Sequence, residues 1–555
     1  MIERQILSLI DQTLKGMERF KGLYAGDSLR LEIPKDPSHG DLSSNISFKL
    51  AKALKANPNE IAQEVSFSIR NNLGSSKLKD RIGEVEALNG FINFRFTPKC
   101  LREILGEIKE EKGRFGCCRS GRGKSVQVEF VSANPTGPLS IAHARQAAFG
   151  DSLANVLRSC GFKVSREYYV NDEGVQISLL GKSIYARYKE ILNERCEFPS
   201  EGYKGEYIIG IANETYKRYG KKYAEETEAN LKFFSDYGVK HLLKEIKDEL
   251  SDFDVKFDRW YKQSSLAKSG SIEKTLKILE DKGLLYEKEG AIWFKSTAFG
   301  DDKDRVVKKS DGAYTYIAPD IAYHKDKFKR GFDKVIDIWG PDHHGYISRM
   351  RAAVQALGFA DERISIIIIQ LATLYKNGKP IPMSTRAGEY VTLREVLDEV
   401  GKDAARFFFL MRKASAHLDF DLELAKRQTP ENPVYYVQYA HARICSISEF
   451  KGGKRIGAAK ETDLELLKAD EELQLLRQLR QFPMAVRLSA QELEPYRIIL
   501  YLQNLATSFH KFYEAHRVVS DDLALTRARL LLVYCVRQVL ANSLSLLGVS
   551  CPKKM

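Results

Sequence analysis

The stretch Val128-Glu-Phe-Val-Ser-Ala-Asn-Pro-Thr-Gly-Pro-Leu-Ser-Ile-Ala-His143 decides the fold of this chain. It begins as an alternating apolar strand, turns at prolines and a glycine, and enters a helix near His143. Amide groups at a helix N-terminus are unpaired and carry partial positive charge, so they attract phosphate. The stretch therefore predicts a nucleotide-binding strand-turn-helix, in which the small Ala142 and Ala144 leave room for a base or ribose. A histidine at a helix start can equally be a cap or a packed side chain, and the surrounding pattern has to decide.

The apolar periodicity on either side of this stretch predicts a parallel sheet. In chain order, the expected elements are a strand at 126–131, a helix at 144–160, strands at 164–170 and 334–340, a helix at 346–357 and a strand at 364–370. The first three form a βαβ unit, the building block of parallel sheets. The last strand is continuously apolar, and such strands are usually buried on both faces, as in a doubly wound α/β fold.

Changes of pattern along the chain predict a multidomain α/β protein. Residues 1–115 are expected to form an N-terminal α+β domain. Residues 116–425 are expected to form a Rossmann-like domain with a doubly wound parallel sheet and a charged helical insertion at about 180–290. After about 425 the strand pattern stops, and 426–555 predicts an α-helical bundle. Its helices are expected at 433–449, 463–481, 495–516 and 523–547.

Length and charge narrow the classes of function. A chain of 555 residues is too long for one hydrophobic core. Lys and Arg number 87 against 74 Asp and Glu, which gives a net charge of +13. This excess suits a polyanionic partner, with RNA or DNA as the first candidates, although a generally basic soluble protein would have it too.

Cysteine spacing and apolar runs give no sign of a secreted, metal-binding or membrane protein. The eight cysteines contain no C-x-x-C pair, which argues against a zinc site or a disulfide framework and favours reduced thiols in the cytoplasm. The first ten residues are too polar for a signal peptide. The most apolar late segment, 523–547, is interrupted by three arginines, so we expect no membrane span.

A second informative segment is Pro382-Met-Ser-Thr-Arg-Ala-Gly-Glu-Tyr-Val391. It follows the last apolar strand and a loop that contains Lys376, Gly378 and Lys379. A basic, glycine-containing loop after a parallel strand lies on the ligand-binding edge of such a sheet. Both segments are therefore expected to direct polar groups at one site.

These two segments, in this order and at this separation, resemble the signature motifs of class I aminoacyl-tRNA synthetases. The wider chain resembles the bacterial arginyl-tRNA synthetases from the turn at 34–41 to its last residue. Five further stretches carry the likeness: Glu129-Phe-Val-Ser-Ala-Asn-Pro-Thr-Gly-Pro-Leu139, Arg166-Glu-Tyr-Tyr-Val-Asn-Asp172, Trp339-Gly-Pro-Asp-His-His-Gly-Tyr346, Asp403-Ala-Ala-Arg-Phe-Phe-Phe-Leu-Met-Arg412 and Asn432-Pro-Val-Tyr-Tyr-Val-Gln-Tyr-Ala-His-Ala-Arg443.

The resemblance implies that ATP activates L-arginine, with release of pyrophosphate, and that the arginyl group then passes to the 3′ end of tRNA. Phosphoryl chemistry of this kind depends on charge stabilisation and positioning. By likeness, the catalytic residues are His143, Ser384 and Arg386. The ATP-binding residues would be Pro138, Ser140, Ile141, Ala142, His143, Ala144, His343, Met383 and Ser384. Mg²⁺ would travel with the nucleotide, so no protein-built metal site is expected.

The resemblance also implies an arginine site. A guanidinium group calls for an acid that can form paired hydrogen bonds with it. The family's Tyr-x-x-x-Asp pattern matches Tyr316 and Asp320, while Glu129 and Asn134 match the positions that hold the amino and carboxylate end of the amino acid. Without the family, Asp320 after a proline would be interpreted as a turn or cap residue.

The C-terminal bundle resembles the anticodon-binding domain of these synthetases, and the N-terminal domain by resemblance contacts the outer corner of tRNA. Phe509, Lys511 and Tyr513 mix aromatic and basic side chains on one helix, which suits unstacked anticodon bases. Core packing is the alternative for each aromatic residue. The expected partners are arginine tRNAs, L-arginine and ATP, with no DNA and no membrane, for a cytoplasmic monomer.

The chain departs from the family at both motifs. Ser140 and Ala142 stand where the family usually has His and Gly, and Pro382 and Thr385 replace two lysines. Some family members without the second lysine carry a compensating lysine at the position of Gly137, which this chain also lacks. The candidate compensating cations are Lys376, Lys379 and Arg386.

Three interpretations follow from the sequence. The first is a functional arginyl-tRNA synthetase. The second is a synthetase-derived paralogue with weakened or lost aminoacylation that binds tRNA in a regulatory role, which the altered motifs favour. The third is a synthetase for another amino acid, which Asp320 and Tyr316 disfavour. The length of the chain argues against a small nucleotidyltransferase.

Overall fold

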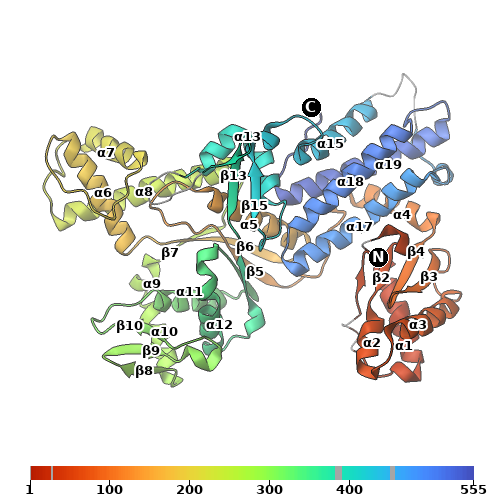
Figure 1. The fold of residues 1–555 in the computed structure, drawn as a ribbon, viewed down its shortest axis with the longest axis horizontal. Coiled ribbons are helices and arrows are strands. Elements are labelled where there is room, and N and C mark those ends of the chain that lie inside the picture. The colour runs from red at the N-terminus through yellow and green to blue at the C-terminus, as the bar shows by residue number, and fades with distance from the viewer. Residues whose placement is uncertain (1, 25, 27–28, 35, 382–389, 450–456) are drawn as a thin grey trace.

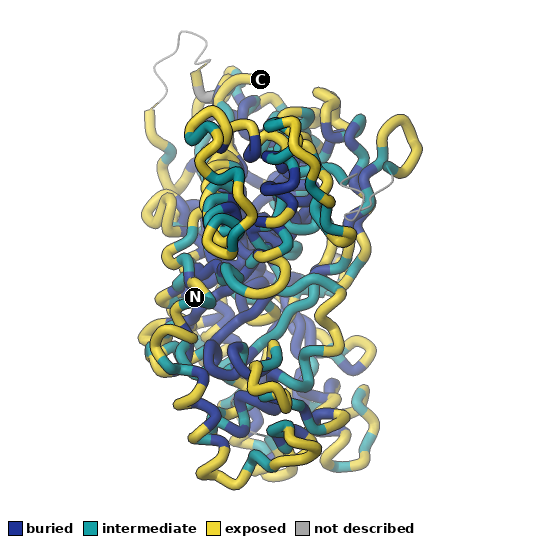
Figure 2. The backbone as a smooth tube through the Cα atoms, turned by 90° about the vertical axis from the view of Figure 1, so that its left-hand side faces the viewer, coloured by how far each residue is buried: buried dark blue, intermediate teal, exposed yellow. Residues whose placement is uncertain are grey.

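The computed structural model describes residues 2–24, 26, 29–34, 36–381, 390–449 and 457–555. Figure 1 shows three parts: a central sheet domain, a helical bundle beside it, and the N-terminal domain below the bundle. Figure 2 shows that the buried residues run through the middle of the molecule, while the outer loops are exposed. The multidomain α/β fold predicted from the sequence is confirmed.

The N-terminal domain is a four-stranded antiparallel sheet covered by helices. Its strands follow the order β1-β2-β4-β3. The elements are α1 (Ile2–Gly16), β1 (Leu31–Glu32), β2 (Leu42–Ser44), α2 (Ile46–Leu54), α3 (Pro58–Leu73), β3 (Ile82–Leu88), β4 (Phe91–Phe96) and α4 (Pro98–Glu111). Proline at the first turn and an Asn or Thr cap explain where α3 and α4 begin.

The central sheet has five parallel strands in the order β12-β11-β5-β6-β7. They are β5 (Ser125–Glu129), β6 (Lys163–Val170), β7 (Arg259–Lys262), β11 (Lys334–Trp339) and β12 (Ile364–Ile368). The chain builds outward from β5 in one direction and then from β11 in the other. The point between β5 and β11 is therefore the topological switch point, where doubly wound sheets bind ligands at the carboxyl edge.

Helices and two small sheets surround this central sheet. The helices are α5 (Ile141–Ser159), α6 (Val175–Ile191), α7 (Glu206–Tyr219), α8 (Glu228–Asp252), α9 (Ser264–Lys268), α10 (Ser271–Asp281), α11 (Ile317–Lys329), α12 (Ile347–Ala356), α13 (Leu393–Phe409) and α14 (Leu422–Lys426). One small sheet joins β8 (Leu285–Lys288), β9 (Ala291–Phe294) and β10 (Arg305–Lys308). The other joins β13 (Ala372–Lys376), β14 (Lys379–Pro380) and β15 (Leu418–Asp421).

Two expectations for this domain were wrong in detail. Within the expected insertion, α6, α7 and α8 share a core of their own, which lies at one end of the molecule in Figure 1, whereas α9 and α10 belong to another core. After α8, the chain returns to the central sheet as β7, whose four residues gave too short a signal to detect. In addition, β12 is an edge strand, and four of its five residues are half-buried rather than buried on both faces.

The C-terminal part contains α15 (Pro433–Glu449), α16 (Glu461–Leu464), α17 (Asp470–Glu492), α18 (Tyr496–Ala515) and α19 (Leu523–Leu547). The helix expected at 463–481 lies later in the chain: α17 begins at Asp470 and continues through Pro483 to Glu492. By length and composition, α19 could cross a membrane, and half of its most apolar window is buried. It packs against α4, α5, α15 and α18, and Arg527 and Arg529 pair with acids of α16 and α17.

Candidate active site

The carboxyl edge of β5 carries an abrupt turn of the chain. Glu129 ends the strand, and two residues later Val131 and Ser132 have positive φ angles of 68° and 40°. Left-handed backbone is rare for a β-branched residue. The Ser132 hydroxyl donates to Glu129 Oε1 at 3.0 Å and accepts from the amide of Tyr169 at 3.0 Å. These bonds hold the turn against the neighbouring strand β6.

The first motif forms the N-terminus of α5. Ser140 is the N-cap residue, in extended conformation, and His143 lies in the first turn. The backbone amide of Ser140 donates to His143 Nδ1 at 3.1 Å. Burial lowers the pKa of His143 to about 4, so the ring is neutral at pH 7. With Nδ1 accepting, the ring proton lies on Nε2, which leaves that nitrogen as a hydrogen-bond donor.

The segment that follows the second motif is tied to the first motif by backbone hydrogen bonds. Ser140 and Thr392 form an antiparallel bridge. The amide of Ile141 donates to Val391 at 3.2 Å, and the amide of Leu393 donates to Leu139 at 2.8 Å. The start of α5 and the chain at 391–393 therefore lie side by side. Met383, Ser384 and Arg386, together with Pro382 and Thr385, lie outside the described residues.

The remaining residues expected to contact ATP differ in exposure. Ile141 and Ala144 are buried, and their backbone amides donate to the carbonyls of Val391 and Ser140. Ala142 and Pro138 are half-buried, and the Pro138 carbonyl accepts from the Tyr390 hydroxyl at 3.2 Å. His343 is exposed in a short 3₁₀ helix, Pro341–Tyr346, with its ring centre 6.0 Å from that of Trp339.

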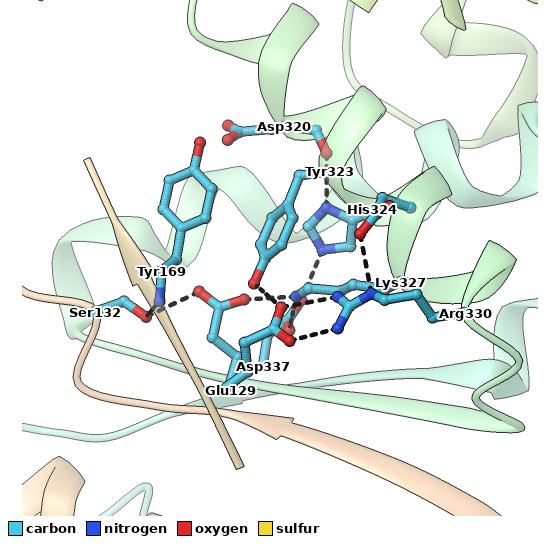
Figure 3. Close-up of polar contacts among 11 residues, drawn as sticks. Glu129, Ser132, Tyr169, Asp320, Tyr323, His324, Lys327, Arg330 and Asp337 are labelled. Atoms are coloured by element: carbon cyan, nitrogen blue, oxygen red, sulfur yellow. Dashed lines mark hydrogen bonds and ion pairs between the residues drawn. The ribbon is translucent and has the colours of Figure 1, made fainter. Parts of the chain in front are cut away.

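One face of α11 places a series of polar side chains against the sheet (Figure 3). Lys327 Nζ lies 2.5 Å from Glu129 Oε2 and 2.6 Å from Asp337 Oδ1. His324 Nε2 lies 2.7 Å from Asp337 Oδ2, and its Nδ1 lies 2.8 Å from the backbone carbonyl of Asp320. A second ion pair joins Arg330, just after α11, to Glu167 on β6. Charged groups from β5, β6, β11 and α11 therefore meet in the interior.

Opposite charges compensate for the burial of this cluster. The side chains of Lys327 and Asp337 are both fully buried. Burial alone would lower the pKa of Lys327, but the attraction of Asp337 and Glu129 outweighs it and raises that pKa. Burial would raise the pKa of Asp337, yet Lys327 and His324 hold it well below its usual value. Buried charges of this kind persist only when they are paired.

The expected arginine-binding residues lie in different settings. Asp320 is half-buried and accepts from the Tyr346 hydroxyl at 3.0 Å. Burial raises the pKa of Asp320 to about 6, against the opposing effects of His324 and Tyr346. Tyr316, one turn earlier, is 74% exposed. Asn134 donates to the Gln176 side chain at 2.6 Å.

Sequence reasoning missed Lys327, His324 and Asp337. A signal for them was present. Asp320, His324 and Lys327 recur at helical spacing on α11. Asp337 is the single acid inside the apolar strand Lys334-Val-Ile-Asp-Ile-Trp339, and a buried acid requires a buried partner.

The two described candidates for a compensating cation are not equivalent. Lys376 Nζ lies 2.9 Å from Glu399 on α13. Lys379 is exposed on β14. At Gly137, an added Cβ would lie 3.2 Å from the Tyr207 hydroxyl and 3.3 Å from that of Tyr390, so these two tyrosines border the position.

The prediction that Phe509 contacts tRNA is wrong, because its ring is completely buried in the bundle and offers no face to a base. Lys511 is exposed and Tyr513 is half-buried. The guanidinium of Arg443 lies 5.2 Å from the Tyr513 ring centre and 5.1 Å from that of Tyr439. Aromatic and cationic groups are therefore adjacent on α15 and α18.

Three family models match the chain in sequence. Residues 4–96 match the arginyl tRNA synthetase N-terminal domain, 106–417 the catalytic domain of class I tRNA synthetases (R), and 437–555 the DALR anticodon binding domain. This chain belongs to the arginyl-tRNA synthetases. Its catalytic domain is of the class I, ATP-utilising type.

Relatives of known name agree along the full length. The chain is 46% identical to the arginine–tRNA ligase of Syntrophotalea carbinolica over 100% of both chains. It is also 46% identical to that of Bacillus subtilis over 95% of this chain and 94% of the relative. Among solved structures, the Thermus thermophilus arginyl-tRNA synthetase covers 100% of both chains with a TM-score of 0.78 at 22% identity, which shows the shared fold.

Membership of this family decides between the three interpretations that the sequence left open. The synthetase is an arginine–tRNA ligase, and arginine is its amino acid. Nothing in the comparisons favours a regulatory paralogue.

Proposed function

We propose that this synthetase forms arginyl-adenylate at the carboxyl edge between β5 and β11, and that His143 is its central catalytic residue. The observation that supports the proposal is the backbone bridge between Ser140 and Thr392, which holds the start of α5 beside the chain that follows the second motif. Glu129 at the end of β5 and Asp320 on α11 add negative charge near the same edge, which suits a cationic amino acid.

In the first step, the arginine carboxylate attacks the α-phosphorus of ATP and pyrophosphate leaves. His143 Nε2 donates a hydrogen bond to phosphate oxygens as their charge increases, and it needs no protonation change to do so. Ser384 and Arg386 hold the phosphates from the second motif. Mg²⁺ enters with the triphosphate and neutralises part of its charge. Within the described ranges, no group of three or more His, Cys, Asp or Glu side chains could hold a metal ion.

Arginine is held at both ends. Asp320 accepts two N–H groups of the guanidinium, with the exposed Tyr316 beside it, and Glu129 accepts the α-ammonium group. Asn134 holds the carboxylate end. The pKa of the Asp320 carboxyl group is raised by burial, and such a group gains most from a cationic partner.

The missing motif lysines call for another cation. Lys379 is a better candidate than Lys376, because Glu399 already pairs with Lys376. Arg386 is the third candidate. We expect replacement of the compensating residue by Ala to slow arginine-dependent pyrophosphate exchange at least tenfold with tRNA present. If none of the three substitutions slows exchange, another group supplies the charge.

The partners follow from the domain organisation. We place domain boundaries near 115 and 425, with the bundle binding the anticodon and the N-terminal domain contacting the outer corner of tRNA. Lys511 and Tyr513, supported by Arg443, supply cationic and aromatic contacts on the bundle. We further propose that the synthetase acts as a cytoplasmic monomer, with no DNA or membrane partner.

Aminoacylation of tRNA with arginine and with lysine by the purified chain tests the activity at this site. We expect arginine to be charged at an ordinary enzymatic rate and lysine not to be charged. Tight tRNA binding without charging of arginine would instead show that the substitutions at 140, 142, 382 and 385 have abolished catalysis.

A further inference from the structure

A continuous buried network joins the two ends of the proposed arginine site. It runs from Glu129 through Lys327 and Asp337 to His324, and from there to the backbone of Asp320 (Figure 3). Each step is a contact of 2.5 to 2.8 Å between charged or strongly polar groups. The network therefore links the acid at the end of β5 to the helix that carries Asp320.

We propose that Lys327 is a positioning residue that orients Glu129 toward the α-ammonium group of arginine. This inference rests on the proposed function, in which Glu129 binds that group. Lys327 is 0% exposed, so it cannot touch the substrate itself. It acts through the carboxylate that it holds.

The geometry assigns different tasks to the two oxygens of Glu129. Oε2 is held by the Lys327 ammonium at 2.5 Å, while Oε1 contacts only the Ser132 hydroxyl among the hydrogen bonds of the described residues. A neutral hydroxyl is a weaker partner for a carboxylate than an ammonium group. The α-ammonium of arginine would therefore replace the weaker partner at Oε1 without disturbing Oε2.

Asp337 and His324 fix Lys327 in turn. Asp337 Oδ1 binds the Lys327 ammonium, and Asp337 Oδ2 binds His324. Both nitrogens of His324 face oxygen atoms, one of them the carbonyl of Asp320. The Glu129 carboxylate is thus tied through Lys327, Asp337 and His324 to the helix that carries Asp320.

Two ligands test the proposal. Arginine and 5-guanidinopentanoate share the guanidinium, the carbon chain and the carboxylate, and only arginine has the α-amino group. For the wild-type chain, we expect calorimetry to give roughly hundredfold weaker binding of 5-guanidinopentanoate, because this ligand has no α-ammonium group to contact Glu129 Oε1. This affinity ratio measures how well Glu129 is positioned.

The informative variant is Lys327→Met combined with Asp337→Asn, which removes one buried charge of each sign and so avoids leaving Asp337 as an unpaired, fully buried carboxylate. We expect the affinity ratio to fall below about tenfold, with the KM for ATP unchanged. A ratio that stays near a hundred would overturn the proposal. A merely structural role would weaken both ligands equally and leave the ratio intact.

Two further variants keep the test decisive. Lys327→Arg retains the cation, but its side chain is longer, so it should displace Glu129 and give an intermediate affinity ratio. A wild-type affinity ratio in this variant would also overturn the proposal. This test remains available if the double variant fails to fold. Lys325→Met, on the same helix but directed at Thr275 of α10, is the matched control and should leave the ratio unchanged.

The results separate this inference from the proposed function. If the wild-type chain binds no arginine, the proposed arginine site falls. If it binds both ligands equally well, arginine still binds, but Glu129 does not contact the α-amino group and the role of Lys327 falls with it.

Discussion

At the scale of single residues, His143 combines a fixed tautomer with a lowered pKa. The Ser140 amide occupies Nδ1, and burial keeps the ring neutral. Ser140, at the position where the family usually has histidine, is the N-cap residue of α5, and its amide and hydroxyl both lie 3.1 Å from His143 Nδ1. The capping requires a small oxygen-bearing side chain, which serine provides.

His143→Ala should lower the kcat of arginine-dependent pyrophosphate exchange by about 10²–10³-fold, because a hydrogen bond to the charged phosphates is lost. Ser140→Ala is the comparison variant. It removes the hydroxyl 3.1 Å from Nδ1 but keeps the backbone amide at 3.1 Å, so we expect a loss of exchange rate below about tenfold and a helix-cap cost of about 1 kcal/mol in unfolding free energy. A His143→Ala variant with wild-type exchange would contradict the assignment.

Arginine binding should depend on pH through Asp320. Because burial raises its pKa to about 6, the carboxyl group is protonated below that pH and cannot pair with a guanidinium. Affinity should therefore rise roughly tenfold per pH unit up to about pH 6 and level off above it. Calorimetry from pH 5 to 7.5 checks this. Asp320→Asn should bind weakly with little pH dependence, and a wild-type midpoint near 4 would show that the carboxyl group is not perturbed.

At the scale of elements, the end of α19 is fixed by a buried arginine. Arg406 on α13 donates to the carbonyl of Leu547 at 2.8 Å and to that of Phe253 at 3.0 Å, and it pairs with Asp151 on α5. Gly548, with a φ of 66°, follows the helix, and a Cβ there would lie 2.3 Å from the Arg406 guanidinium. Three helices thus share one cation.

Gly548→Ala should lower the free energy of unfolding by roughly 2–4 kcal/mol, because a left-handed backbone position and a close contact with Arg406 both become strained. Gly300→Ala is the control: its φ is 90° and nothing lies within 4 Å of the added Cβ, so only the backbone strain of about 1–2 kcal/mol applies. Urea denaturation measures both. Equal losses in the two variants would show that Arg406 moves aside freely.

Elements with strong periodicity could be predicted, and those shaped by tertiary contacts could not. The expected ranges for α15, α18 and α19 agree with the structure to within about one residue. The helix expected at 463–481 is instead α17, Asp470–Glu492, which continues through Pro483 and packs against α18 and α4. In the site, the sequence motif predicted where His143 lies. The tautomer of His143 depends on the Ser140 amide, and the pKa of His143 depends on burial, so neither could be predicted from the motif. The pairing of Lys327 with two distant strands depends on the assembled sheet.

At the scale of the whole molecule, the net charge of +13 predicts strong salt dependence of tRNA binding. The logarithm of the association constant should fall linearly with the logarithm of salt concentration, with at least a tenfold loss between about 50 and 200 mM. Filter binding at a series of salt concentrations measures the slope. Arginine affinity is the control and should change much less, because buried ion pairs are weakly screened. A flat tRNA slope would argue against phosphate contacts.

The bend after β5 has a consequence for the energetics of substrate binding. Ser132 bonds to Glu129 and to the strand beside it. Under the proposed function, recognition at this end would exchange partners on a rigid frame: the hydroxyl would give way to an ammonium group, with little loss of chain entropy. The enthalpy of arginine binding should reflect the difference between these two hydrogen bonds rather than the full strength of the new one.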